Sequence, residues 1–174
     1  MPVKLNSELA AFFETGDQPS QTEFGHLIDS ILPIPVVLPD ASSTALAKAT
    51  YQGRTLVVPN TSQASTYTME VPAAAGEWYK FVYGGAAADA SDHIFTMTTA
   101  LYKGGVIWHN GITNDNSDDA VDNIFSTSVY ADASNDVILT LNTPEIYEIN
   151  FLALSTTVVY VWGYIDSLNA PVFS

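Results

Sequence analysis

The sequence predicts an all-β protein, an antiparallel β-sandwich preceded by a short N-terminal helical arm. From residue 54 onward, about nine short segments alternate apolar and polar residues between turn signals, a spacing typical of sandwiches and barrels. No helical pattern of useful length interrupts them, so we expect purely antiparallel sheets. Before residue 40 the pattern is helical instead. These observations divide the chain into an arm over 1–39, a linker over 40–53 and a β-sandwich domain over 54–174.

The arm carries the signals of two short helices. Asn6 or Ser7 can cap the first helix, and Gly16 stands where it would end. Ser20 and Glu23 then form the S-x-x-E capping box that begins the second. The first helix is apolar along one side: Leu9, Phe12 and Phe13. The second shows the i, i+3, i+4, i+7 stripe of an amphipathic helix: Phe24, Leu27, Ile28 and Ile31.

The apolar side of the arm needs a partner, because helices of two or three turns are marginal on their own. One interpretation is a helical hairpin folded back on its own domain. The other is an arm that packs on another subunit or on a larger assembly. Pro33, Pro35 and Pro39 favour the second interpretation, because they predict an extended connection that leads away from a compact body.

The domain is predicted to consist of short strands in sequence: 54–58, 66–71, 78–83, 93–102, 105–109, 123–130, 136–141, 145–154 and 156–165. Gly104 and Gly105 are expected to be hairpin or loop glycines at the start of the strand 105–109. The last strand is apolar on both faces, which is typical of a strand covered twice. One cover is the core of the sandwich. We expect the other to be the arm or a neighbouring subunit, so that one face becomes a subunit interface: Val158, Tyr160, Trp162 and Tyr164.

Charge excludes some partners. Five Lys and Arg residues against nineteen Asp and Glu residues give a formal charge of −14, which is repelled by phosphate backbones, so we expect no nucleic-acid partner. The same charge suits docking on a basic surface. No run approaches the roughly 18 apolar residues of a membrane helix, and we expect no membrane partner.

Residues that carry chemistry are sparse. His26, His93 and His109 fall in three different elements without the spacing of metal ligands, and each is expected at a surface or an interface. Paired carboxylates can support glycoside hydrolysis, but the strand-borne acids occupy outward-facing positions of alternating patterns: Glu70, Glu145 and Glu148. We therefore expect no enzyme and no cofactor.

One acidic cluster raises the question of calcium, which prefers oxygen ligands. Its members lie within nine residues of one another: Asp115, Asp118, Asp119 and Asp122. The segment lacks the central glycine and the terminal glutamate of the helix-loop-helix calcium motif. We favour a solvated loop without a metal and keep calcium as the alternative.

Two stretches resemble virion proteins of tailed bacteriophages. Residues 13–30 (FETGDQPSQTEFGHLIDS) are similar to an F-x-T-G-x-x-P-T-x-x-x-F-x-x-L-I-D-S segment near the N-termini of such proteins, with Ser20 in place of threonine. Residues 71–89 (VPAAAGEWYKFVYGGAAAD) resemble a segment of β-rich capsid-decoration and head-fibre proteins. The resemblance implies a jelly-roll sandwich that forms a homotrimer at capsid three-fold positions. It implies a cement protein on the capsid surface that bridges and stabilises subunits of the major capsid protein.

The same resemblance allows a different role, a tail or head-fibre module that recognises carbohydrate on the host surface. Such a module needs exposed aromatic rings. The candidates in the sequence are Trp78, Trp108 and Tyr102.

Overall fold

The protein is described by a computed structural model, which covers residues 20–31, 34–84, 90–110, 126–131 and 135–174. It is mostly β, with 52% of residues in strands and 9% in helices, so the predicted all-β class is confirmed. Two sets of predicted residues lie outside the described ranges. They are the first part of the arm with Leu9, Phe12 and Phe13, and the acidic segment with Asp115, Asp118, Asp119 and Asp122.

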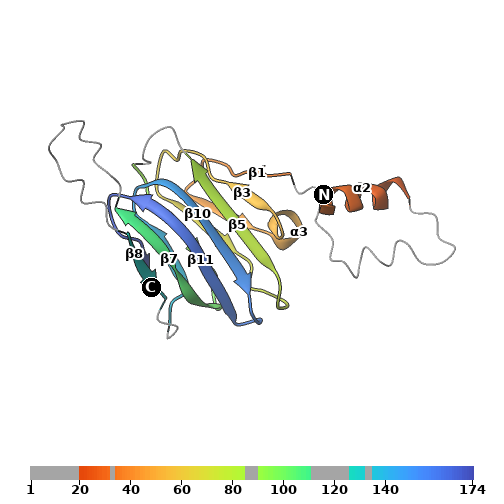
Figure 1. Cartoon of the computed structure of the whole chain (residues 1–174). Helices are drawn as coiled ribbons and strands as arrows, with labels where there is room; N and C mark the ends of the chain where they lie inside the picture. The colour runs from red at the N-terminus through yellow and green to blue at the C-terminus, as the bar shows by residue number, and fades with distance from the viewer. Residues whose placement is uncertain (1–19, 32–33, 85–89, 111–125, 132–134) are drawn as a thin grey trace.

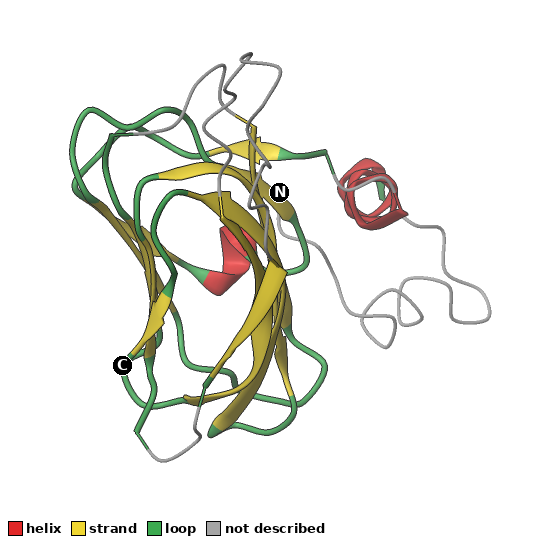
Figure 2. Cartoon of the chain, turned by 60° about the vertical axis from the view of Figure 1, so that its left-hand side comes forward, coloured by secondary structure: helices red, strands yellow, loops and turns green. Residues whose placement is uncertain are grey.

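Two sheets form the body of the molecule (Figure 1). The seven-stranded sheet has the spatial order β1 (Val36–Val37), β3 (Thr55–Val57), β5 (Trp78–Gly84), β10 (Pro144–Ala153), β11 (Val158–Ser167), β7 (Leu101–Asn110) and β8 (Ser126–Tyr130). The five-stranded sheet has the order β12 (Val172–Phe173), β9 (Ile138–Leu141), β6 (His93–Thr96), β4 (Ser65–Met69) and β2 (Ser43–Leu46). Two helices are described: α2 (Gln21–Ile31) and α3 (Lys48–Tyr51). Figure 2 shows the two sheets as two facing layers.

The sheets are mixed, and the expectation of purely antiparallel sheets is wrong. In the large sheet β10 runs antiparallel to β5 and β11, but β1–β3, β3–β5 and β7–β11 are parallel pairs. In the small sheet β2, β4 and β6 are parallel neighbours. The reason lies in the path of the chain, which passes from one sheet to the other after each of the strands β1 to β6. Alternate strands along the chain, such as β1, β3 and β5, therefore lie in the same sheet and run in the same direction. Each pair of them is connected through a strand of the opposite sheet, where other parallel sheets use a crossover helix.

Some predicted boundaries also differ from the structure. The strand expected over 93–102 is divided into β6 and the start of β7, and β7 continues through the strand expected over 105–109. The expected linker 40–53 instead contains β2 and α3, and the end of the expected arm supplies β1. Leu38 and Leu46 are buried in the core. Leu38 follows the two-residue strand β1, and Leu46 ends the four-residue strand β2. Strands this short are not long enough for alternation to be recognised in the sequence.

The core between the sheets is aromatic. Phe81 of the large sheet meets Phe95 of the small sheet with ring centroids 4.6 Å apart, and Phe151 lies 5.8 Å from Phe95. Each ring is fully buried, which stabilises the fold by about 1.5–3 kcal/mol for a side chain of this size. The predicted inward face of β5 is buried as expected: Tyr79, Phe81 and Tyr83.

A polar group is enclosed at one end of this core. His93 is fully buried, so its expected position at a surface or an interface is wrong. Its Nδ1 lies 2.8 Å from the hydroxyl of Tyr147, and its Nε2 lies 3.4 Å from Oγ1 of Thr61. The rings of Tyr67, Tyr83 and Tyr147 stand nearly perpendicular to the imidazole. Alternation along β6, which also points Phe95 inward, is what places His93 in the core.

Candidate interaction surfaces

Helix α2 begins with the predicted capping box. The backbone N–H of Ser20 donates to Oε2 of Glu23 at 2.6 Å, and the backbone N–H of Glu23 donates to Oγ of Ser20 at 3.3 Å. The Ser20 backbone N–H, followed by its hydroxyl, lowers the pKa of the Glu23 carboxyl. These bonds satisfy helix N–H groups that have no partner within the helix, and so define where α2 starts.

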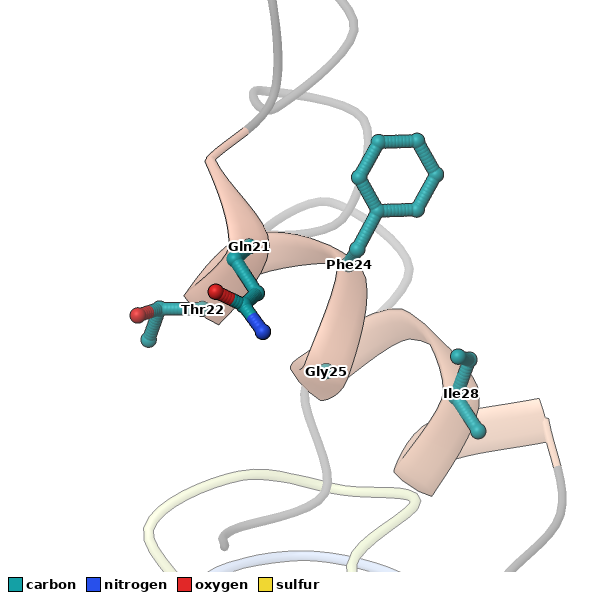
Figure 3. A pocket seen from close by; sticks show the side chains of 5 residues that line it. All are labelled: Gln21, Thr22, Phe24, Gly25 and Ile28. Carbon is teal, nitrogen blue, oxygen red and sulfur yellow. The ribbon is translucent and has the colours of Figure 1, made fainter.

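The apolar stripe of α2 is exposed. Phe24 is 49% exposed and Ile28 is 58% exposed, while Leu27 is half-buried. The side chain of Ile31 lies outside the described set. Figure 1 shows α2 apart from the two sheets, beyond β1 at the edge of the large sheet. Figure 3 shows Phe24 and Ile28 projecting outward from the helix. Together with Gln21, Thr22 and Gly25 they line a hollow of about 490 Å³.

The second apolar surface is the outer side of the large sheet. Strand β11 points Val159, Val161 and Ile165 into the core. Its opposite face points outward, with Tyr160 42%, Trp162 38% and Tyr164 40% exposed and Val158 half-buried. The exposed apolar side chains of β5, β7 and β10 continue this surface. We call the set the aromatic face: Trp78, Ile107, Ile146, Tyr160, Trp162 and Tyr164.

Strand register orders the aromatic face into rows. Tyr160 stands opposite Leu152, and Leu152 stands opposite Trp78, so three outward apolar side chains cross three strands. Along β11 the rings of Tyr160 and Trp162 stack, with centroids 5.4 Å apart and planes at 25°. The two exposed rings therefore form one stacked aromatic pair on β11, next to the central strand β10.

Two glycines make this arrangement possible, although the sequence predicts them as hairpin or loop glycines. Gly104 and Gly105 lie inside β7, and Gly104 has φ +95°, a conformation that side chains with a Cβ rarely adopt. A Cβ on Gly104 would approach the ring of Tyr160 to 2.7 Å, and one on Gly105 would approach the ring of Tyr130 to 2.8 Å. The missing side chains leave room for both rings against β7. The sequence signal was a glycine pair inside an otherwise strand-like stretch.

Charged groups border the aromatic face. Nζ of Lys80 lies 2.8 Å from Oε2 of Glu148, and the hydrogen bond from Lys80 is the main cause that lowers the pKa of Glu148. Lys103 is exposed and stands opposite Tyr160. Two of the five Lys and Arg residues therefore lie on this surface, whereas the chain as a whole carries −14. The neighbourhood of the aromatic face is close to neutral.

The three aromatic residues proposed for carbohydrate recognition differ in how exposed they are. Tyr102 is fully buried, so its expected exposure is wrong. Trp108 points inward, packs partly buried against the core and donates from Nε1 to the carbonyl oxygen of Ser167 at 3.0 Å. Trp78 is exposed and belongs to the aromatic face. The structure brings Tyr160 and Trp162 to the same surface, and the pattern of strand β11 already predicted that their face lies opposite the core.

The carboxylates of Glu70 and Glu77 bind the first residue of α3, Lys48. Glu70 accepts from the backbone N–H of Lys48 at 3.0 Å, and Glu77 lies 3.1 Å from Nζ of the same lysine. Burial, with Glu70 and Glu77 nearby, raises the pKa of the Tyr79 hydroxyl. Within the described ranges, no three His, Asp or Glu side chains gather as they would around a metal ion. The four aspartates of the calcium alternative lie outside those ranges.

Comparisons of the chain with protein-family models, with curated proteins and with solved structures found no significant match. Neither of the described helices is long and apolar enough to cross a membrane.

Proposed function

We propose that the chain is a non-enzymatic virion structural protein, a decoration or cement protein on the capsid surface of a tailed bacteriophage. One observation supports this role most: a strongly acidic sandwich exposes two separate apolar surfaces, the stripe of α2 and the aromatic face. Exposed patches of this kind are typical of interaction sites. The resemblance of residues 13–30 and 71–89 to virion proteins supplies the context.

Each surface has a role in this proposal. The arm binds the assembly on the capsid, through Phe24, Leu27 and Ile28 of α2 together with the other apolar residues of the arm. The outward face of β11 joins copies into a homotrimer, because a closed ring leaves no apolar face in water. The jelly-roll class of the sandwich belongs to the same proposal. Buried apolar area contributes about 25 cal/mol per Å², so many bridging copies would hold neighbouring major capsid subunits together without any catalysis.

Removal of the arm tests the proposal. Because Val36, Val37 and Leu38 belong to the sandwich, the deletion should end at residue 33 rather than reach into β1. We expect the shortened protein to keep its β-rich circular dichroism spectrum and to lose binding to capsids that lack the native protein. A matched full-length variant, Thr22→Ala, leaves the stripe intact and should bind normally. Full occupancy of the capsid by the shortened protein would overturn the anchoring role of the arm. A separate measurement, the copy number per virion, tests the decoration role, which only about a dozen copies, the level expected of a tail component, would overturn.

A second candidate function has its own observation. The stacked rings of Tyr160 and Trp162 are exposed, and Asn150 stands opposite Trp162 on the neighbouring strand. Exposed aromatic rings beside an amide can bind a sugar ring in a tail or head-fibre module. A glycan array read with the native protein and with Trp162→Ala separates the two functions. Binding of a host glycan that is lost in the variant would favour carbohydrate recognition.

A further inference from the structure

We propose that α2 of one copy docks on the aromatic face of a neighbouring copy, so that the copies exchange arms. The inference rests on the proposed assembly function and changes one part of it. The α2 stripe, assigned above to the capsid, is assigned here to the aromatic face of a neighbouring copy, so the arm contributes to capsid binding by building the assembly. Both surfaces are present on every copy, so the contact needs no other protein. In a closed ring, each copy gives one helix and receives one.

The two surfaces are compatible in length. The described stripe from Phe24 to Ile28 extends over about 6 Å, because an α-helix rises 1.5 Å per residue. The exposed rings from Tyr160 to Tyr164 extend over about 13 Å, because a strand rises about 3.3 Å per residue. A helix that lies along β11 can therefore keep Phe24, Leu27 and Ile28 on aromatic side chains.

The charges of the two surfaces are compatible. Helix α2 carries Glu23 and Asp29 and contains no Lys or Arg. The aromatic face carries the Lys80–Glu148 ion pair and the exposed Lys103, so it is close to neutral in a chain with a formal charge of −14. An acidic helix is therefore repelled less by the aromatic face than by a surface with the average charge of the chain.

The direction of the arm favours a neighbouring copy over the helix's own sheet. Strand β1 is the outermost strand of the large sheet, four strand spacings or about 19 Å from β11. Figure 1 shows the helix on the far side of β1, away from β10 and β11. The connection before β1 is exposed at Ile34 and Pro35. A helix held beyond the edge of its own sheet is placed to meet the sheet of another molecule.

Disulfide trapping tests this contact directly, because the chain has no cysteine of its own. Gln21 lies beside the stripe of α2, and Asn150 stands opposite Trp162, so Gln21→Cys and Asn150→Cys keep every apolar residue of the two surfaces. The two variants, one carrying a size tag, are mixed and oxidised mildly. We expect a mixed disulfide between them. The control replaces Asn150→Cys with Ser43→Cys, which is exposed on the small sheet and should give only background cross-linking.

Three results would overturn the inference. One is a yield of the mixed disulfide between Gln21→Cys and Asn150→Cys that is no higher than the yield with the Ser43→Cys control. Another is a chain carrying both cysteines that closes on itself at high dilution, which would place the helix on its own sheet. The third is an unchanged yield after Phe24→Asp is added, because that change should reduce the yield at least about tenfold, a loss equivalent to about 1.4 kcal/mol. These measurements use free protein, so a failure to bind capsids would refute the proposed function while a mixed disulfide still supported arm exchange.

Discussion

At the scale of single residues, His93 shows how much the core depends on a few polar contacts. The imidazole has no access to solvent, and its Nδ1 lies 2.8 Å from the hydroxyl of Tyr147. When a buried hydroxyl loses a hydrogen bond, the free-energy cost of having removed it from water is no longer offset by that bond. The aromatic rings around His93 supply packing but cannot replace that partner.

We predict that His93→Phe lowers the free energy of unfolding by about 1–3 kcal/mol, because it leaves the Tyr147 hydroxyl without this bond. Urea unfolding followed by circular dichroism measures the change. The double variant His93→Phe/Tyr147→Phe should recover part of the loss, because it removes both polar partners. Equal or greater destabilisation of the double variant would show that ring packing rather than the hydrogen bond is the important contribution.

Gly104 supports a second prediction at this scale. Its φ of +95° disfavours any Cβ, and an added Cβ would lie 2.3 Å from the carbonyl oxygen of Val161. We expect Gly104→Ala to destabilise the protein by more than about 1 kcal/mol. Gly84 is the matched control, because a Cβ there meets nothing within 4 Å. Thermal unfolding of the two alanine variants provides the comparison, and equal melting temperatures would contradict the strain assigned to Gly104.

At the scale of elements, adjacent strands of the large sheet share the ion pair between Lys80 on β5 and Glu148 on β10. The pair lowers the pKa of Glu148 below its ordinary value of 4.5. A carboxyl with a lowered pKa in the folded state stabilises the protein above its ordinary pKa, and this contribution is lost as the pH falls through the lowered value. Because the side chains are about one-third exposed, the contribution is under about 1 kcal/mol.

We therefore predict that Glu148→Gln reduces stability slightly at pH 7 and has no effect at a pH well below the lowered pKa of Glu148. The measurement is the unfolding free energy of both proteins across this range. The outward substitution Leu152→Met on the same strand, which changes no charge, is the control. A difference between Glu148→Gln and the native protein that grows as the pH falls would contradict the predicted sign.

The elements also show which parts of the structure could be predicted. Long alternating stretches such as those of β5 and β10 identified both the strands and their buried faces, since each has enough residues for the period to be seen. β1, β2 and β12 have between two and four residues, so no period exists to be recognised. The arm stripe and the face of β11 were predicted from sequence, whereas the stacking of Tyr160 on Trp162 depends on register and on Gly104, which no local pattern encodes.

At the scale of the whole molecule, charge and apolar surface oppose each other. Each chain carries −14, so association brings like charges together, while the aromatic face and the arm stripe favour contact. Salt shortens the range of the repulsion, with a Debye length of about 8 Å at physiological ionic strength. Burial of apolar surface is not weakened in this way.

We predict that self-association of the full chain stays constant or strengthens between low salt and about 0.5 M, where surface charges are strongly screened. Sedimentation velocity at several protein concentrations measures it. Trp162→Ser, which removes a ring without changing charge, should weaken association at every salt concentration. A steep loss of the native oligomer with rising salt would show that ion pairs, rather than apolar burial, hold the copies together.

The passage of the chain from sheet to sheet after each of the strands β1 to β6 also bears on how the protein folds. In a pair such as β2 and β4, the intervening strand lies in the opposite sheet, so most pairings join residues far apart in sequence. Such topologies fold slowly, because chain entropy is lost before contacts compensate for it. The β10–β11 hairpin is different, since Leu154 N–H donates to the carbonyl of Val158 across a tight turn. We predict that Ile149→Val in this hairpin slows refolding in stopped-flow measurements, whereas Leu46→Ala in β2 mainly accelerates unfolding.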